Sequence, residues 1–186
     1  MNTQQKNIDM GSVNWIGLWT LYLREVRRFL KVYTQTLAAP IVTTLLFLAI
    51  FVLALGGATR TVGDVPFTVF LAPGLIVMAI AQNAFANTSS SIMISKVQGN
   101  IIDTLMPPFT AHELTFGIAL GGASRGICVG AVVALTMAIF VDMEIHHWGF
   151  IIYHGFMASL MLSLLGTIGG IWSEKFDHIA AVTNFI

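Results

Sequence analysis

Four long apolar segments are the feature of this sequence that most restricts its fold. They cover residues 37–55, 67–95, 114–141 and 149–172. The first has 19 residues and would measure about 28 Å as a helix, close to the thickness of the hydrocarbon core of a bilayer. Charged residues make up only 10% of the chain, against about 25% in soluble domains. Because lipid offers no partners for backbone polar groups, we expect an all-α, polytopic integral membrane helical bundle.

The two ends of the chain differ from the apolar segments between them. Residues 1–12 are polar and are expected to be disordered, ahead of one transmembrane domain over residues 13–186. A further apolar run opens at Ile179, but from there to Ile186 it is too short to cross a bilayer as a helix. We interpret this run as the start of a fifth span of a longer protein, and a re-entrant segment is the alternative.

An amphipathic pattern with helical spacing precedes the first span, over residues 13–33. One face carries the apolar residues Trp15, Leu18, Trp19, Tyr22, Val26, Phe29, Leu30 and Tyr33. The opposite face carries the polar residues Thr20, Arg24, Arg27, Arg28 and Lys31. Tryptophans together with a basic face are typical of a helix that lies in the membrane interface. The alternative is the cytosolic start of the first span, with charges that only set its orientation.

The second apolar segment is unusually polar in its second half. Four of its polar residues share one helical face, at positions i, i+4, i+7 and i+8: Asn83, Asn87, Ser90 and Ser91. Such a face is costly in lipid, so we expect it to contact protein or a cavity. Hydrogen bonding between helices is one interpretation, and a transport path or a dimer seam is the other.

Small residues recur at every fourth position of the third apolar segment, and they predict close helix contact. They are Gly122, Gly126, Gly130, Ala134 and Ala138. The fourth segment has a similar stripe: Gly155, Ser159, Ser163, Gly166 and Gly170. Arg125 lies beside the first stripe, where an arginine at mid-membrane costs about 2.5–3.5 kcal/mol. We interpret Arg125 as a structural charge rather than a substrate contact.

The longest polar interruption between two apolar segments is Lys96–Glu113, with the sequence KVQGNIIDTLMPPFTAHE. Gly99-Asn100 breaks the preceding helix, and Pro107-Pro108 ends any helix that follows. A short helix over Ile101–Met106 is therefore predicted. This helix is interpreted as a docking surface for a partner protein, with three apolar residues and one central acid: Ile102, Leu105, Met106 and Asp103. A passive loop, whose prolines only end a helix, is the alternative.

The lysines and arginines are distributed unequally between the two sides of the membrane. With the N-terminus in the cytoplasm, the outer side receives only Arg60. The cytoplasmic side receives Lys6, Arg24, Arg27, Arg28, Lys31, Lys96, Lys175 and, by snorkelling, Arg125. This asymmetry follows the positive-inside rule, so the sequence predicts a cytoplasmic N-terminus in the plasma membrane and a cytoplasmic position for the polar stretch.

The sequence lacks the common motifs of catalysis and nucleotide binding. It contains no G-x-x-x-x-G-K-[ST] phosphate loop, no H-E-x-x-H and no G-x-S-x-G, so we expect no catalytic site in this chain. The loop over residues 142–148 holds two histidines and two acids, which is too few ligands in one place for us to predict a metal site. Cys128 is alone, which excludes an internal disulfide, and a net charge of zero argues against a nucleic-acid partner.

Two short motifs, in this order and spacing, resemble a known family. Phe70–Gly74 reads FLAPG, and Gly99–Pro108 reads GNIIDTLMPP and is followed by Glu113. With the amphipathic helix and the spans, from about residue 15 onwards, they resemble the permease subunit of ATP-binding-cassette type-2 exporters. In that family the segment between spans two and three is a coupling helix that docks in a groove of a separate ATPase subunit. The resemblance assigns this docking to Gly99, Ile101, Ile102, Asp103, Leu105, Met106, Pro107 and Pro108.

The same resemblance implies partners, cargo and location. The permease would pair with a second copy of itself in a homodimer and with ATPase subunits that bind ATP and Mg²⁺, so this chain would carry no cofactor. It would lie among the lipids of a bacterial inner membrane and export a lipid, polysaccharide, drug or similar amphiphile. The family has six spans, whereas this sequence ends at the start of the fifth. A secondary transporter or channel that works without ATP is the alternative, although such proteins more often carry carboxylates within their spans.

Overall fold

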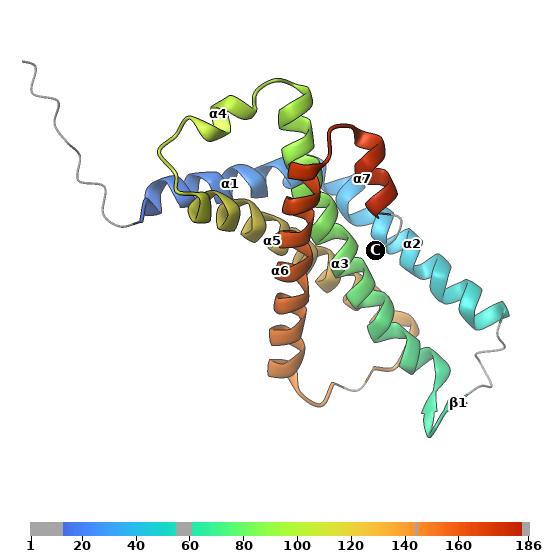
Figure 1. Ribbon diagram of the computed structural model, residues 1–186. Helices are drawn as coiled ribbons and strands as arrows, with labels where there is room; N and C mark the ends of the chain where they lie inside the picture. Colours follow the sequence, from blue (N-terminus) through green and yellow to red (C-terminus); the bar gives the residue numbers. More distant parts are fainter. Residues whose placement is uncertain (1–12, 55–60, 144, 184–186) are drawn as a thin grey trace, which may run out of the picture.

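The computed structural model describes residues 13–54, 61–143 and 145–183. Within these ranges the chain forms seven helices and one short hairpin (Figure 1). In chain order they are α1 (Trp15–Leu30), α2 (Tyr33–Ala54), β1 (Thr61–Val62), β2 (Val65–Pro66), α3 (Phe67–Val97), α4 (Ile101–Leu105), α5 (Ala111–Phe140), α6 (Trp148–Trp172) and α7 (Phe176–Thr183). The polar residues 1–12 lie outside the described residues.

The helices α2, α3, α5 and α6 are each long and apolar enough to cross a membrane. The prediction of an all-α polytopic bundle is therefore confirmed, with boundaries that differ by a few residues. The first span begins at Tyr33 rather than at residue 37, and it contains Pro40 in its interior. The third span begins at Ala111 rather than Leu114, because Thr110 caps it three residues earlier.

The core of the bundle is made by α3, α5 and α6. Close approach depends on glycine: a Cβ at Gly126 would lie 2.9 Å from the Ala84 side chain and would also collide with Ser159. Where the helices meet, serine hydroxyls bond across to backbone carbonyls, from Ser163 to Ala119 at 2.6 Å and from Ser159 to Ala123 at 2.9 Å. Most of the two predicted stripes of small residues thus faces the other stripe or α3, as expected for membrane helices without a strong hydrophobic drive to associate, whereas Ala138 at the end of the first stripe is exposed.

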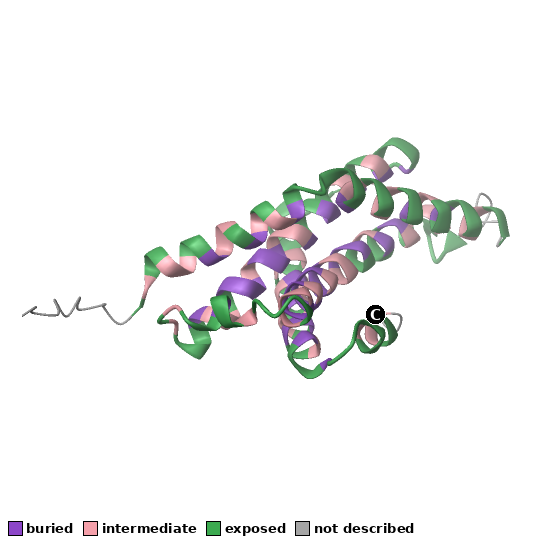
Figure 2. Cartoon of the chain, turned by 90° about the horizontal axis from the view of Figure 1, so that it is seen from above, coloured by how far each residue is buried: buried purple, intermediate pink, exposed green. Residues whose placement is uncertain are grey.

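Helix α2 is attached far more loosely than the other spans. Only 11% of the residues in its most apolar 18-residue stretch are buried, against 39% in the corresponding stretch of α3. Figure 2 colours most of α2 as exposed or intermediate. Its main apolar anchor is Leu48, which joins a cluster with Leu75 of α3 and Val133 of α5. One face of α2 therefore rests on the bundle and the rest is open.

Two elements depart from the predicted layout. Part of the loop expected between the first two spans is an antiparallel hairpin, in which Thr61 pairs with Pro66 and Val62 with Val65. Gly63 turns this hairpin with a φ of +62°, a value that favours glycine. The final apolar run begins earlier than expected, at Phe176, as α7, which contacts α3 and α6.

Helix α1 lies crosswise to α6, at the end of the bundle that also carries α4 (Figure 1). It packs mainly against α5. Its buried residues, Leu21, Glu25 and Phe29, follow one another at four-residue intervals and so form a single contact stripe. An acid in the middle of this stripe is unexpected, because the other two buried residues are apolar.

Candidate functional site

The short helix α4 stands between the end of α3 and the start of α5 and projects from the bundle (Figure 1). Gly99 follows the end of α3 and has a φ of +72°, a backbone angle that residues other than glycine rarely adopt. It turns the chain out of α3 toward α4. The helix ends at Leu105, one residue earlier than predicted, and Met106 caps it through a 2.8 Å bond from its backbone N–H to the carbonyl of Ile102. Pro107 and Pro108 follow and prevent any extension.

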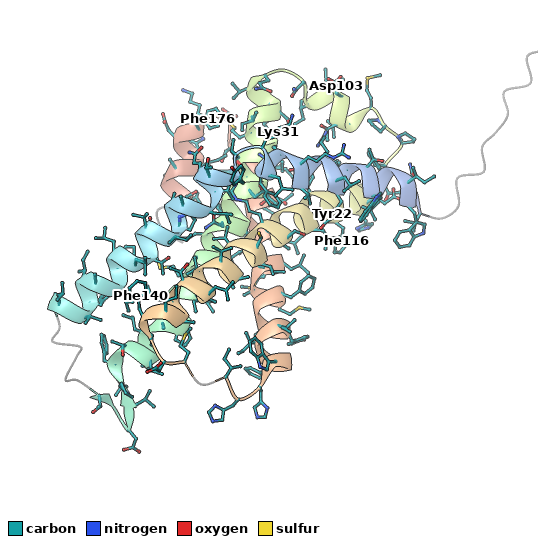
Figure 3. All side chains as sticks on the ribbon, turned by 180° about the vertical axis from the view of Figure 1, so that it is seen from behind. Tyr22, Lys31, Asp103, Phe116, Phe140 and Phe176 are labelled. Atoms are coloured by element: carbon teal, nitrogen blue, oxygen red, sulfur yellow. The ribbon has the colours of Figure 1, made fainter. Side chains whose placement is uncertain are left out.

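The outward side of α4 is apolar and open. Ile102, Leu105 and Met106 are 60%, 60% and 77% exposed. Asp103 is exposed beside them, and Figure 3 shows it at the outer edge of the molecule, far from Phe140 at the other end. Three large apolar side chains on a single projecting turn around one acid form a surface suited to a protein groove.

The inward side of α4 fixes it to α1. Ile101 is half-buried against a cluster of Leu21, Ile92 and Ile118. Thr104 is buried, and its hydroxyl accepts a 3.0 Å hydrogen bond from the Arg24 guanidinium of α1. The sequence analysis placed Arg24 only on a basic interfacial face, whereas the structure uses it as the contact between α1 and α4.

Glu25 is the centre of a polar cluster beneath α4 and is only 1% exposed. Its carboxylate lies 3.3 Å from Arg24 and 3.2 Å from Arg28, and it accepts a 2.8 Å hydrogen bond from Ser91 of α3. Arg28 also donates to Asn87, at 2.6 Å to the backbone carbonyl and 2.9 Å to the side-chain oxygen. The cluster of Arg24, Glu25, Arg28, Asn87 and Ser91, here called the α1–α3 lock, holds the two helices in one register.

Burial governs the electrostatics of this lock. Desolvation lowers the pKa of the Arg28 guanidinium from its ordinary value, and the nearby Glu25 carboxylate opposes that change. A buried ion pair adds little net stability, but removing one partner leaves the other uncompensated at a cost of about 3–5 kcal/mol. Arg24 is 47% exposed in its side chain and can be solvated, so Arg28 is the more important partner of Glu25.

A second carboxylate, Glu113, connects the starts of α5 and α1. Its Oε2 accepts hydrogen bonds from Thr110, at 2.7 Å from the backbone N–H and 2.9 Å from the hydroxyl, while Thr110 Oγ1 accepts from the Glu113 N–H. This is a capping box. The other oxygen, Oε1, accepts from the backbone N–H of Asn14, which is the N-cap of α1. The Glu113 side chain thus ties the end of the segment that follows α4 to the start of α1.

Lys96 fixes the segment that precedes α4. Its ammonium donates to the carbonyls of Gly170 at 2.9 Å and Ser173 at 3.0 Å, and also to that of Ile171. These carbonyls end α6 and have no partner within that helix, so the lysine serves as their cap. On both sides of α4, therefore, the chain is anchored to other helices by charged side chains.

Comparison with known proteins identifies relatives of this chain. A protein family described as "ABC-2 type transporter" matches residues 17–186. The chain belongs to the ABC-2 type transporter family. The chain is 32% identical over 172 residues to the inner membrane transport permease YadH of Escherichia coli K12, which covers 92% of this chain and 67% of that protein. The same protein from Shigella flexneri gives the same values. No solved structure gives a significant match.

As a member of the ABC-2 family, this chain is a membrane permease subunit of a transporter rather than a catalytic enzyme. Its described residues contain no group of three or more His, Cys, Asp and Glu side chains able to hold a metal ion. The family membership agrees with the resemblance found in the FLAPG motif and the Gly99–Pro108 segment. Docking by the residues of α4 stays a prediction.

The predicted polar face of α3 points toward other helices of the permease. Asn87 and Ser91 are buried and belong to the α1–α3 lock, while Asn83 and Ser90 are half-buried. Asn83 accepts a 3.4 Å hydrogen bond from Arg125 of α5. The four residues therefore face α1, α5 or the groove beside α2, and their place on a transport path or in a dimer seam stays a prediction.

The predicted amphipathic helix is present as α1, and its position in the membrane interface stays a prediction. Trp15 and Trp19 are 71% and 60% exposed, and Arg27 is exposed, as a helix at a membrane surface requires. Arg28, however, turns inward to the α1–α3 lock, although the sequence analysis placed it on the outer polar face. The helix therefore uses part of its polar face for contacts within the protein.

Glu25 is the residue that sequence reasoning missed. It lies four residues from both Leu21 and Phe29, so it occupies the stripe of α1 that packs on the bundle. The flanking arginines at positions 24 and 28 were a usable signal, because an acid on a contact face near bases favours a buried pair. The partners on α3 could not be predicted, since nothing in the periodicity of one helix identifies its neighbour.

Proposed function

We propose that this chain is the permease subunit of an ATP-driven exporter in a bacterial inner membrane, and that α4 is the surface through which a separate ATPase subunit moves it. The observation that carries the proposal is the composition of α4. Its outer side exposes Ile102, Leu105 and Met106 around Asp103, and its inner side is bonded to α1. The relatives named as inner membrane transport permeases support the location.

In this proposal the α4 segment acts as a lever. A movement of α4 reaches α1 through Arg24 and Thr104, α3 through the α1–α3 lock, and α6 through Lys96. The prolines at 107 and 108 stiffen the exit from α4, so the movement passes to α5 instead of being absorbed by the loop. The N-terminus and α4 lie in the cytoplasm, and ATP and Mg²⁺ bind to the partner.

The assembly and the cargo complete the proposal. A second permease copy, in a homodimer, and two ATPase subunits form the working transporter, surrounded by membrane lipids. The cargo is a lipid, polysaccharide, drug or similar amphiphile that leaves the cytoplasm. The support for export is the resemblance of the α3–α5 connection to type-2 exporters.

The test is replacement of one exposed apolar residue of α4. Because burial of one such side chain at an interface contributes about 1.5–3 kcal/mol, Leu105→Asp should weaken ATPase binding by about tenfold or more. The full-length permease is purified from detergent and the retained ATPase is quantified, with Leu105→Met as the matched control that keeps volume and apolarity. Full retention of the ATPase by both Leu105→Asp and Asp103→Lys would refute the docking role of α4, whereas failure of the unchanged permease to retain any ATPase would favour a transporter that works without ATP.

A further inference from the structure

An open groove of about 720 Å³ lies between α1, α2 and α3 and reaches Arg125 of α5. It is lined by two arginines, Arg28 and Arg125, and by no aspartate or glutamate among the described residues. Glu25 pairs with Arg28 from outside the groove. Arg125 therefore faces the groove with no carboxylate partner among the described residues, whereas Arg28 is shared between the groove and Glu25.

The hydrogen bonds of these groups are incomplete within the described part of the chain. The guanidinium of Arg125 has a single weak contact, 3.4 Å to the Asn83 side-chain oxygen, and its buried Nε has no acceptor. The buried Nε of Arg28 and the fully buried side-chain nitrogen of Asn87 also have none. Three nitrogen donors in residues that line one groove therefore lack acceptors among the described residues, whereas buried polar groups in proteins are nearly always hydrogen-bonded.

The groove reaches deep along the spans. Asn83 lies 14 residues before the end of α3 at Val97, and Arg125 lies 14 residues after the start of α5 at Ala111. Both are therefore about 21 Å of helix away from the end of the molecule that carries α4. A charged side chain at such a distance along a spanning helix is costly and usually marks a functional pathway.

The rest of the groove lining mixes apolar side chains with glutamine, threonine and serine, and it carries no further charge. Phe29, Phe47, Leu75 and Met78 line it together with the polar groups, and Phe47 and Met78 are each 38% exposed. The ligand that suits both halves has an anionic group for the arginines and a hydrocarbon part for these side chains. A guanidinium matches a phosphate, sulfate or carboxylate particularly well, because its planar N–H groups bond two oxygens at once.

We propose that this groove binds the anionic group of an amphiphile, with Arg125, Arg28 and Asn87 as its donors. The claim that such an amphiphile is the exported cargo rests on the proposed function, whereas the binding itself does not. The anionic group has two sources, the headgroup of a bilayer phospholipid and a separate amphiphile taken from the cytoplasm.

The first experiment measures binding with the full-length permease alone, in nanodiscs. Photoactivatable phosphatidylglycerol and phosphatidylcholine with identical acyl chains are compared as probes, and labelled peptides of α2 and α3 are quantified. The anionic lipid should label the groove about tenfold more than the zwitterionic one, and Arg125→Gln should remove most of this preference. Arg125→Lys, which keeps the charge but loses the planar fork, should retain part of it.

The matched control is Arg27→Gln, which removes an exposed arginine of α1 that does not line the groove. It should leave the preference unchanged. Equal labelling by the two lipids, or the same behaviour of Arg125→Gln and Arg27→Gln, would overturn the proposal. If Arg125→Gln does not fold, competition in the unchanged protein decides: dodecyl phosphate should displace the label, and equal displacement by dodecyl maltoside would overturn the proposal.

A second readout separates the two sources of the anion. Stimulation of ATP hydrolysis by dodecyl phosphate in the permease–ATPase complex, lost in Arg125→Gln, identifies the ligand as cargo. Displacement of the label without stimulation identifies a site for a bilayer lipid, and both results support anion binding. Because labelling needs no ATPase, a failure of α4 docking would leave this result readable.

Discussion

The helical core and the end that carries α4 are held together by different chemistry. In the core, α3, α5 and α6 meet through glycines and serines, such as Gly126 against Ser159, at distances that leave no room for a side chain. At the other end, α1 and α4 are held by charged groups, with Glu25, Glu113 and Lys96 each bonding to a distant segment. Close packing resists deformation, whereas a few directional bonds fix a geometry and can still be exchanged for others.

The difference fits the two tasks of a transporter subunit. A core of membrane-spanning helices benefits from rigidity. Under the proposed function, the end that carries α4 receives force from the ATPase and benefits from contacts that are defined but can be exchanged. The comparison predicts that substitutions in the core lower stability, whereas substitutions at the α4 end lower coupling more than stability.

The largest effect is expected for Gly126→Leu. A Cβ there would lie 2.9 Å from both the Ala84 side chain and the Ile80 carbonyl, so the added side chain has no place without moving α3. We expect destabilisation of about 3 kcal/mol or more and loss of monodisperse protein in detergent. Gly74→Leu is the control, since a Cβ there meets nothing within 4 Å. Equal yields of the two variants would mean that the core is not closely packed at this point.

Glu25→Gln comes next. The change leaves Arg28 without its carboxylate, but the Arg28 side chain is 31% exposed, so we expect a cost of about 2 kcal/mol, below that of a fully buried pair. Equilibrium unfolding in mixed detergent micelles measures it, with the exposed Arg27→Gln as a control that should stay within about 0.5 kcal/mol. A cost as small as that of the control would show that the α1–α3 lock does not hold the two helices together.

The smallest effect on stability is expected for Thr104→Val. It removes the 3.0 Å bond from Arg24, whose side chain is 47% exposed and can find water instead, so stability should fall by less than about 1 kcal/mol. ATPase binding should be retained, while ATP hydrolysis coupled to transport falls severalfold, because α4 is less firmly tied to α1. Unchanged coupling of ATP hydrolysis to transport in this variant would show that the bond between Arg24 and Thr104 does not transmit movement of α4 to α1.

The sequence predicted most of the core and less of the α4 end, for a physical reason. Spans, glycine stripes and the position of α4 follow from periodicity and from Gly99, Pro107 and Pro108, all of which act locally. The bonds of Glu25 to Ser91 and of Lys96 to the end of α6 join residues far apart in the sequence. Such pairs depend on the arrangement of helices in space, which the pattern within one helix does not encode.

The groove residues show the same limit. The polar face of α3 was visible from the positions of Asn83 and Asn87, and the cost of Arg125 in a span was visible from its surroundings. That both meet Arg28 of α1 at one groove appears only in the folded chain. From the sequence Arg125 was interpreted as a structural charge, whereas in the folded chain its Nε has no acceptor among the described residues, which is the observation behind the proposed ligand.

The most direct test of the account is photocrosslinking from α4 to the ATPase in the assembled transporter. A photoreactive amino acid is placed at position 105 of α4, and in a second variant at the exposed position 139, near the opposite end of α5. The account predicts a covalent adduct of the permease with the ATPase from position 105 and none from position 139. No adduct from position 105, or equal adducts from both positions, would contradict the claim that α4 is the docking surface.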